Sequence, residues 1–233
     1  MKQDIVQWKR WPVRMFILLW SASIAACTGI PTINPTASQR VNLGDILSDV
    51  AFDQPYEWEF YRDSSRGILF GIEEGAYRAR IPEGGFAWAM NGTPHTDVAI
   101  QADILPYSTE TDNGFGLACR ASAQGDGDGY YFLISSDGAF TIRRGVNNVI
   151  EPLIAWTRNP SIHEGLSPNR MRIVCVGGYL ALYVNGEFVG ETHDDRYQEG
   201  FAGIAAAVPE GKAVDVAFDN LTIWAASTAP VTP

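Results

Sequence analysis

The sequence predicts an all-β protein, a two-sheet antiparallel β-sandwich of the jelly-roll type. About twelve short runs rich in β-branched and aromatic residues follow one another, separated by Gly, Asn and Asp clusters typical of hairpin turns. No segment repeats its apolar residues at helical spacing over three turns. Many short strands at this spacing, without helices, are typical of concanavalin A-like and other jelly-roll sandwiches.

The length and composition fit a single folded domain. The 233 residues are 46% hydrophobic and 12% aromatic, and sandwiches of this size are commonly one domain. Thr28–Asn42 is rich in Thr, Pro, Ser and Asn, which is typical of a tether. We therefore expect a signal peptide over 1–26, a lipidated cysteine and tether over 27–42, the sandwich over 43–224 and a flexible tail over 225–233.

The N-terminus has the pattern of an export signal. The apolar run 15–26 is shorter than the ~20 residues that a spanning helix needs. It ends in Ile24-Ala25-Ala26-Cys27, which resembles the lipobox of bacterial lipoproteins, where the cysteine becomes the lipid-modified first residue. The alternative is an ordinary secretory signal with an unmodified Cys27. Four basic residues precede the run: Lys2, Lys9, Arg10 and Arg14.

The charge balance limits the partners. The formal net charge is −10, and cleavage after Ala26 removes mostly basic residues. Binding to nucleic acid or to anionic lipid headgroups relies on Lys and Arg. We therefore expect no nucleic-acid partner, and a place on the outer side of a bacterial membrane, at the cell surface or in the periplasm, held by the N-terminal lipid. The oligomeric state stays open.

The clearest strands form a meander over 170–191. Gly177-Gly178 and Asn185-Gly186 tolerate the positive φ angles of two-residue hairpin turns. Directly opposed residues share a face. Two-residue loops therefore predict one face with Cys175 opposite Leu180, Ile173 opposite Leu182, and Leu182 opposite Val189. The other face carries Arg172, Val174, Ala181, Tyr183 and Phe188.

The remaining strands are placed by alternation and turn signals. The expected segments are 75–81, 86–90, 98–105, 114–120, 130–135, 139–143, 149–156, 201–208 and 214–224, and Asn91-Gly92-Thr93-Pro94 is expected to be a turn.

Two further cysteines point into the core. Cys119 alternates with Phe115 and Leu117, and Cys175 shares a face with Ile173. In an oxidising compartment we expect a disulfide between them. It would close a loop of ~57 residues and stabilise the fold by about 4 kcal/mol on the chain-entropy model. Two buried free thiols are the alternative.

A succession of small motifs carries a family resemblance. Taken in order, they are Phe52-Asp53, Trp58, Gly75-Ala76-Tyr77, Trp88, Thr96-Asp97-Val98, 114–120, 129–138, Trp156, 180–186 and Phe218-Asp219-Asn220. The pattern over 50–224 resembles the concanavalin A-like lectin/glucanase superfamily. Within that superfamily it is similar to bacterial laminin-G-like and 3-keto-disaccharide-hydrolase-like domains. The resemblance implies a sandwich fold that hosts lectins, carbohydrate-binding modules, glycosidases and adhesion domains.

The carboxylates give little support for catalysis. A retaining glycosidase needs two carboxyl groups about 5 Å apart, and glucanases of the resembled superfamily carry them as Glu-x-Asp-x-Glu on one strand. The nearest candidates are Glu57 and Glu59, but Tyr61 stands where the third acid would be. We expect no catalytic residues and interpret this pair as solvated edge-strand charges.

The sequence predicts no cofactor. Calcium seeks several oxygen ligands, and Asp126 and Asp128 are the candidate ligands. Tyr131 and Asp137 occupy the positions of the turn glycine and the bidentate glutamate of an EF-hand, so a hairpin loop is the preferred interpretation. The three histidines are too scattered for a zinc motif.

Aromatic side chains are the remaining candidates for ligand contact, because Trp and Tyr offer large area at low entropy cost. Alternation places Tyr131, Tyr183 and Phe188 on outer faces, whereas Trp88, Trp156 and Tyr197 fall at strand ends or loops. The sequence thus predicts a non-catalytic carbohydrate-binding module. A glycoside hydrolase and a structural or protein-interaction domain are the alternatives.

Overall fold

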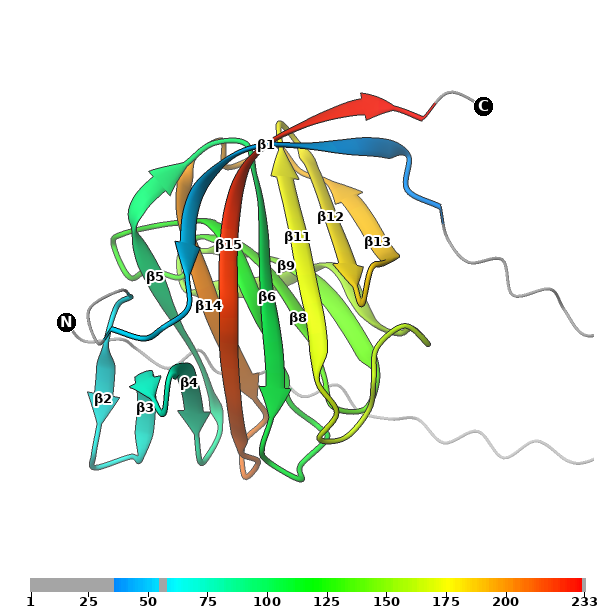
Figure 1. Ribbon diagram of the computed structural model, residues 1–233. Coiled ribbons are helices and arrows are strands. Elements are labelled where there is room, and N and C mark those ends of the chain that lie inside the picture. Colours follow the sequence, from blue (N-terminus) through cyan, green and yellow to red (C-terminus); the bar gives the residue numbers. More distant parts are fainter. Residues whose placement is uncertain (1–35, 55–57, 232–233) are drawn as a thin grey trace, which may run out of the picture.

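The computed structural model describes residues 36–54 and 58–231 as strands and connecting loops (Figure 1). Fifteen strands form two antiparallel sheets that pack face to face. The described residues contain no helix long and apolar enough to cross a bilayer. The predicted all-β sandwich is confirmed.

The first sheet has nine strands in the order β13-β12-β11-β6-β15-β4-β3-β2, with β1 also pairing with β15. Its strands are β1 (Gln39–Val50), β2 (Tyr61–Asp63), β3 (Ile68–Glu73), β4 (Ala76–Ile81), β6 (Val98–Pro106), β11 (Asn169–Val176), β12 (Tyr179–Val184), β13 (Glu187–His193) and β15 (Val214–Pro230).

The second sheet has six strands in the order β10-β9-β8-β7-β14-β5. These are β5 (Gly85–His95), β7 (Gly114–Ala121), β8 (Gly129–Ile134), β9 (Ala139–Val146), β10 (Val149–Arg158) and β14 (Gly200–Val208). Strand β5 continues through 91–94, which the sequence suggested as a turn. The pairing of Pro94 with Phe201 keeps that segment extended.

The core lies between the two sheets and follows the period of two expected for strands. In β4, Tyr77, Ala79 and Ile81 are buried while the residues between them are half-buried. Strand β8 is buried at every position. Its inward Phe132 belongs to the central core and its outward Tyr131 to a separate apolar cluster on the outer face. The sandwich is therefore packed on parts of its outer faces as well.

The meander has the predicted register with one exception. Cys175 pairs with Leu180 and Ile173 with Leu182, and Asn185 and Gly186 both have positive φ, as a type I′ turn requires. Leu182, however, pairs with Gly190 and not with Val189, because the β12–β13 ladder contains a register shift after Leu182. A β-bulge of this kind leaves no clear trace in the apolar pattern.

Both ends of the sandwich are more ordered than the sequence suggested. Strand β1 begins at Gln39, inside the predicted tether, and β15 runs to Pro230, well past the predicted boundary at Trp224. The two segments pair with each other from Gln39↔Pro230 to Val50↔Leu221. These segments consist largely of small and polar residues, so their sequences do not predict strands clearly. Each segment becomes a strand by pairing with the other, which lies at the opposite end of the chain.

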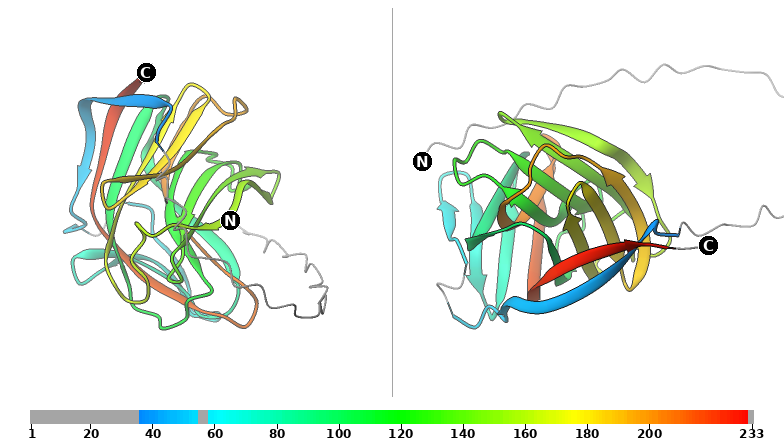
Figure 2. Two further views of the ribbon diagram at one scale, coloured as in Figure 1. Left: turned by 90° about the vertical axis from the view of Figure 1, so that its right-hand side faces the viewer. Right: turned by 90° about the horizontal axis from the view of Figure 1, so that it is seen from above.

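This pairing builds a two-stranded ribbon, residues 39–43 with 226–230, that crosses the upper outer face of the nine-stranded sheet (Figures 1 and 2). Val41 and Ala226 pack on an outer apolar cluster that includes Ala99, Val174 and Tyr179. The backbone N–H of Ser38 donates to Glu191 on β13 at 3.0 Å. The ribbon thus covers the upper half of this face and leaves the lower half open.

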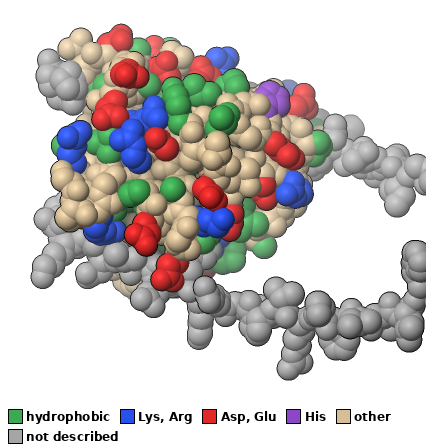
Figure 3. Space-filling view, turned by 90° about the horizontal axis from the view of Figure 1, so that it is seen from below, with side chains coloured by type: hydrophobic (Ala, Val, Ile, Leu, Met, Phe, Trp, Pro, Cys, Tyr) green, Lys and Arg blue, Asp and Glu red, His purple; other side chains and the backbone are tan. Residues whose placement is uncertain are grey.

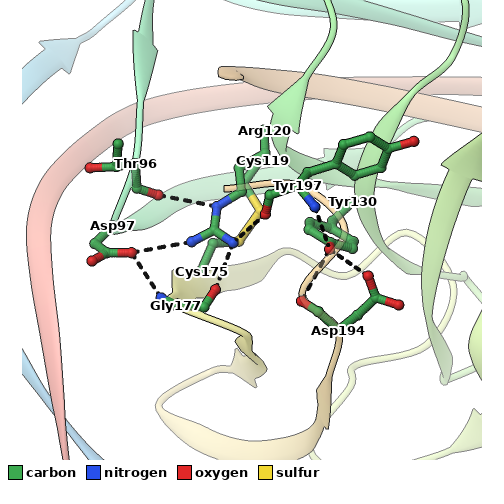
Figure 4. The surroundings of a disulfide bond; sticks show 9 residues. All are labelled: Thr96, Asp97, Cys119, Arg120, Tyr130, Cys175, Gly177, Asp194 and Tyr197. Atoms are coloured by element: carbon green, nitrogen blue, oxygen red, sulfur yellow. Dashed lines mark hydrogen bonds and ion pairs between the residues drawn. A yellow bond between two sulfur atoms is a disulfide. The ribbon is translucent and has the colours of Figure 1, made fainter. Parts of the chain in front are cut away.

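A disulfide and a buried arginine join the two sheets at the upper end (Figure 4). Cys119 on β7 is bonded to Cys175 on β11, as predicted. The adjacent Arg120 side chain has no solvent exposure. Its guanidinium donates to the carbonyl oxygens of Thr96, Gly177 and Tyr197 and to the Asp97 carboxylate. One side chain therefore fixes three separate loops.

Candidate functional site

A groove of about 890 Å³ lies on the lower outer face of the nine-stranded sheet, below the ribbon. Its floor is made by the outward side chains of β6, β11, β12 and β15. Because opposed residues share a face, strand register arranges these side chains in rows across the sheet. Two rows matter most: Tyr183–Arg172–Gln101, and Arg170–Asp103–Asp219.

The second row contains a well-formed ion pair. Arg170 donates from Nε and Nη2 to the two carboxylate oxygens of Asp103, at 2.6 and 3.0 Å, and Asn220 Nδ2 adds a third hydrogen bond at 3.0 Å. The hydrogen bonds from Arg170 and Asn220 lower the pKa of Asp103 below its ordinary value. Asp103 is therefore held in its charged form. Asp219 lies directly opposite Asp103 on β15 and also lines the groove.

The first row offers donors. Arg172 donates from Nε and Nη2 to Oε1 of Gln101, at 3.1 and 2.7 Å. Its guanidinium carbon lies 5.8 Å from the ring centroid of Trp224, which helps to fix its orientation. Tyr183, the cross-strand neighbour of Arg172, packs edge-to-face on Phe188 at 5.5 Å. Burial raises the pKa of the Tyr183 hydroxyl, so it stays protonated and can donate.

An aromatic ring borders the groove at the end of β6. Tyr107 is 48% exposed, and the Arg78 guanidinium carbon lies 3.7 Å from its ring centroid. Arg78 is itself held by a two-pronged ion pair with Asp215. Although burial of Asp215 opposes this, the hydrogen bonds and charges of Arg78 and Arg80 lower its pKa. Tyr107 is thus a ring supported by a fixed cation.

The opposite wall comes from the β10–β11 loop. Asn185 accepts from the Arg170 backbone and donates to Ser161 and Asn169, at 2.8–2.9 Å. Asn169 in turn holds the backbone of His163. These contacts fix the wall, and they explain why Asn occupies the left-handed turn position at 185, where a β-branched residue would be strained.

The six aromatic residues that the sequence singled out do not form one site. Tyr183 lines the groove and Phe188 supports it. Tyr131 and Trp88 lie together on the outer face of the six-stranded sheet, with ring centroids 6.3 Å apart. Both are buried, and the Tyr131 hydroxyl donates to the Gly127 carbonyl. They lie on the other side of the sandwich from Tyr183.

Trp156 and Tyr197 occupy two further places. Trp156 is 39% exposed and borders a smaller hollow of about 330 Å³ between β7, β9 and β14. Its indole covers Gly114, where a Cβ would come within 3.2 Å of the ring. Tyr197 packs on Tyr130 and donates to the Gly145 carbonyl, so it closes the upper loops.

The acidic candidates have structural partners. Glu59 accepts the Met90 backbone N–H at 3.0 Å, and Glu57 lies outside the described residues, as does Cys27. Asp126 accepts from the Asp128 backbone, and Asp128 accepts from the Asn147 backbone at 2.6 Å. Both aspartates thus order their turn. No cluster of metal-ligating side chains occurs within 36–54 and 58–231.

Sequence reasoning missed most of the groove. The groove residues not named as candidates for ligand contact are Gln101, Asp103, Tyr107, Arg170, Asp219 and Asn220, although Asp219 and Asn220 belong to a motif of the family resemblance. Alternation along β6 marks Gln101 and Asp103 as outward, since Ile100, Ala102 and Ile104 are core residues. The sequence alone does not show that β6 pairs with β11 and β15. This pairing brings residues that are distant in the sequence into one row of the groove.

Charges are interspersed on the rest of the lower surface. In the view from below, acidic and basic side chains alternate with uncharged surface, and no large basic patch forms on the described surface in view (Figure 3). This agrees with the net charge of −10. It gives no support to a nucleic-acid interface, which needs a basic stripe.

No family model and no curated protein matches the chain, whereas solved structures match it over most of its length. Carbohydrate-binding module CBM66 from Bacillus subtilis is 15% identical, with a TM-score of 0.60, and the match covers 73% of this chain and 96% of that one. A Bacillus subtilis protein of unknown function with a galectin-like fold is 13% identical, also with a TM-score of 0.60, covering 80% and 99%.

An enzyme has a similar architecture. The GlcNAcα1-4Gal-releasing endo-β-galactosidase from Clostridium perfringens is 10% identical, with a TM-score of 0.55, and the match covers 82% of this chain and 64% of that one. At these identities the likeness establishes the fold. The chain has the galectin-like jelly-roll architecture, consistent with the resemblance to concanavalin A-like sandwiches.

Proposed function

We propose that the protein is a carbohydrate-binding module without catalytic activity and that the groove on the nine-stranded sheet is its binding site. One observation carries the proposal: the groove combines aromatic rings at Tyr107 and Tyr183 with fixed donors and acceptors at Arg172, Gln101 and Asp103. Sugars present apolar ring faces and many hydroxyls, and such ligands need both kinds of contact.

The names of the similar structures support the same ligand class. They include a carbohydrate-binding module and an endo-β-galactosidase. Because the same architecture serves unrelated activities, this support is for sugars in general and not for a particular glycan.

Substituting the groove aromatics is expected to weaken glycan binding. Tyr107→Ala and Tyr183→Ala each remove a ring from the groove, and we expect each to weaken binding to the best ligand of a glycan array by about tenfold, or ~1.4 kcal/mol. Isothermal titration on that ligand measures the effect. Trp156→Ala, which removes a comparably exposed ring from the other sheet, serves as the matched control and should bind normally.

Three outcomes would count against this assignment. Loss of binding in Trp156→Ala alone would move the site to the six-stranded sheet. Binding that survives all three substitutions would remove the aromatic contacts from the mechanism. Silence across broad glycan and polysaccharide panels would favour a structural or protein-interaction domain.

A glycoside hydrolase is the second candidate, favoured by the direct opposition of Asp103 and Asp219 in the groove. Residues opposed across antiparallel strands have Cβ atoms about 5 Å apart, which is close to the spacing of a retaining carboxylate pair. Arg170 holds Asp103 in its charged form, which suits a nucleophile or base. Hydrolysis of array ligands that is lost in both Asp103→Asn and Asp219→Asn would establish the enzyme.

We further propose that Cys27 carries a lipid that anchors the chain to the outer side of a bacterial membrane. The lipobox-like segment 24–27 supports this proposal. Metabolic labelling with palmitate should mark the wild-type protein and be lost in Cys27→Ser, with the variant released from the membrane fraction. Equal labelling of the two proteins would refute the anchor.

A further inference from the structure

We propose that the groove recognises a sugar that carries a carboxylate, and that Arg172 and Gln101 bind this group. The inference rests on the proposed carbohydrate-binding function and specifies its ligand class. It follows from the charge balance of the groove.

Each of two neighbouring arginines already has a carboxylate partner. Arg170 is paired with Asp103 on two oxygens, and Arg78 is paired in the same way with Asp215. An arginine whose charge is neutralised by such an ion pair attracts an anionic ligand only weakly. Arg170 and Arg78 therefore act as supports for the floor of the groove and for Tyr107.

Arg172 differs from both. Its hydrogen bonds go to the neutral amide oxygen of Gln101, and within the described part of the chain it forms no ion pair. Its aromatic neighbour Trp224 is likewise uncharged. The groove thus holds a positive charge without a counter-ion, in a protein whose net charge is −10.

Donors from both partners remain available. Within 36–54 and 58–231, neither Nη1 of Arg172 nor Nε2 of Gln101 has a hydrogen-bond partner, and both residues line the groove. A guanidinium and an adjacent amide N–H suit a carboxylate, which accepts on two oxygens. Tyr183 lies in the same row and contributes its aromatic ring to this end of the groove.

The position of Asp219, the groove carboxylate without an ion-pair partner among the described residues, predicts how the ligand is oriented along the groove. Asp219 is on β15, two strands from Arg172, which is about 10 Å at the usual strand spacing. It would repel a second anionic group and accept hydroxyl donors. An acidic sugar at the Arg172 end, followed by a neutral sugar toward Asp219 and Tyr107, is complementary to this arrangement.

The test compares ligands that differ only in the carboxylate. Polygalacturonate oligosaccharides and their methyl esters form one pair, and sialylated glycans with the methyl esters of their sialic acid carboxyl groups another. We expect the wild-type protein to prefer the free acid by about tenfold or more in affinity, because charge-assisted hydrogen bonds are stronger than neutral ones. Arg172→Gln should remove the preference, because the free acid loses more affinity than the neutral form does.

Arg66→Gln is the control, because it makes the same charge change at the β2–β3 turn, away from the groove. It should bind as the wild type does. Arg172→Lys keeps the charge without the fork, and should retain part of the preference. A normal melting temperature in each variant shows that the fold is intact.

The outcomes separate this inference from the proposed function. Equal binding of acidic and neutral partners would overturn the inference and leave carbohydrate binding in place. A preference for acids that survives in Arg172→Gln would overturn the assignment to Arg172. Absence of binding to every glycan would overturn both proposals.

Discussion

Replacing Arg120 with Met is expected to destabilise the protein by about 3–5 kcal/mol, the usual range for losing one partner of a buried charged network. The variant lacks the guanidinium that donates to three carbonyl oxygens at the upper end of the sandwich, those of Thr96, Gly177 and Tyr197. These hydrogen bonds are only partly buried, so each acceptor left without its donor costs at most about 1–3 kcal/mol. Urea unfolding measures the loss.

The matched control is Arg158→Met. The Arg158 side chain is 67% exposed, although it also pairs with two carboxylates, so its loss should cost at most about 1 kcal/mol. Arg120→Lys retains a charge but not the planar fork, and should recover only part of the stability. A loss below 1 kcal/mol in Arg120→Met would show that solvent or a rearranged loop replaces the arginine.

Removing the disulfide is expected to have a similarly large effect. Cys119 and Cys175 are 56 residues apart, and on the chain-entropy model a loop of this length stabilises the fold by about 4 kcal/mol. The double variant Cys119→Ala/Cys175→Ala should therefore unfold at a lower urea concentration. At roughly 2–4 °C for each kcal/mol in a domain of this size, its melting temperature should fall by about 10 °C.

The reduced wild-type protein provides the comparison. It should lose about the same stability as the double variant, since both lack the cross-link while only the variant lacks the sulfur atoms. Unchanged melting on reduction would contradict the account. Because Cys119 adjoins Arg120, the effects of losing both should be non-additive, which a double-mutant cycle would measure.

The sequence predicted the local architecture well. The meander is the clearest case: two-residue turns at Gly177 and Asn185 determined the pairs Cys175–Leu180 and Ile173–Leu182. The same pairs placed Cys175 in the core, where the disulfide forms. Strand alternation and turn chemistry are local properties, so a single sequence carries them.

Non-local pairing was not predictable in the same way. The β1–β15 ribbon joins segments more than 170 residues apart, and neither segment is apolar enough to be recognised alone. The groove has the same origin, since its rows combine residues of β6, β11 and β15. The aromatics Tyr131 and Tyr183 are both on outer faces, as alternation implies, but only sheet topology separates them onto opposite sides of the sandwich.

The central claim is that the lower outer face of the nine-stranded sheet binds sugar. Titration of the protein with an oligosaccharide ligand, followed by backbone amide NMR, tests it most directly. We expect chemical-shift changes clustered on β6, β11 and β12, around Gln101, Arg172 and Tyr183. Changes clustered instead around Trp156 on the six-stranded sheet would contradict it.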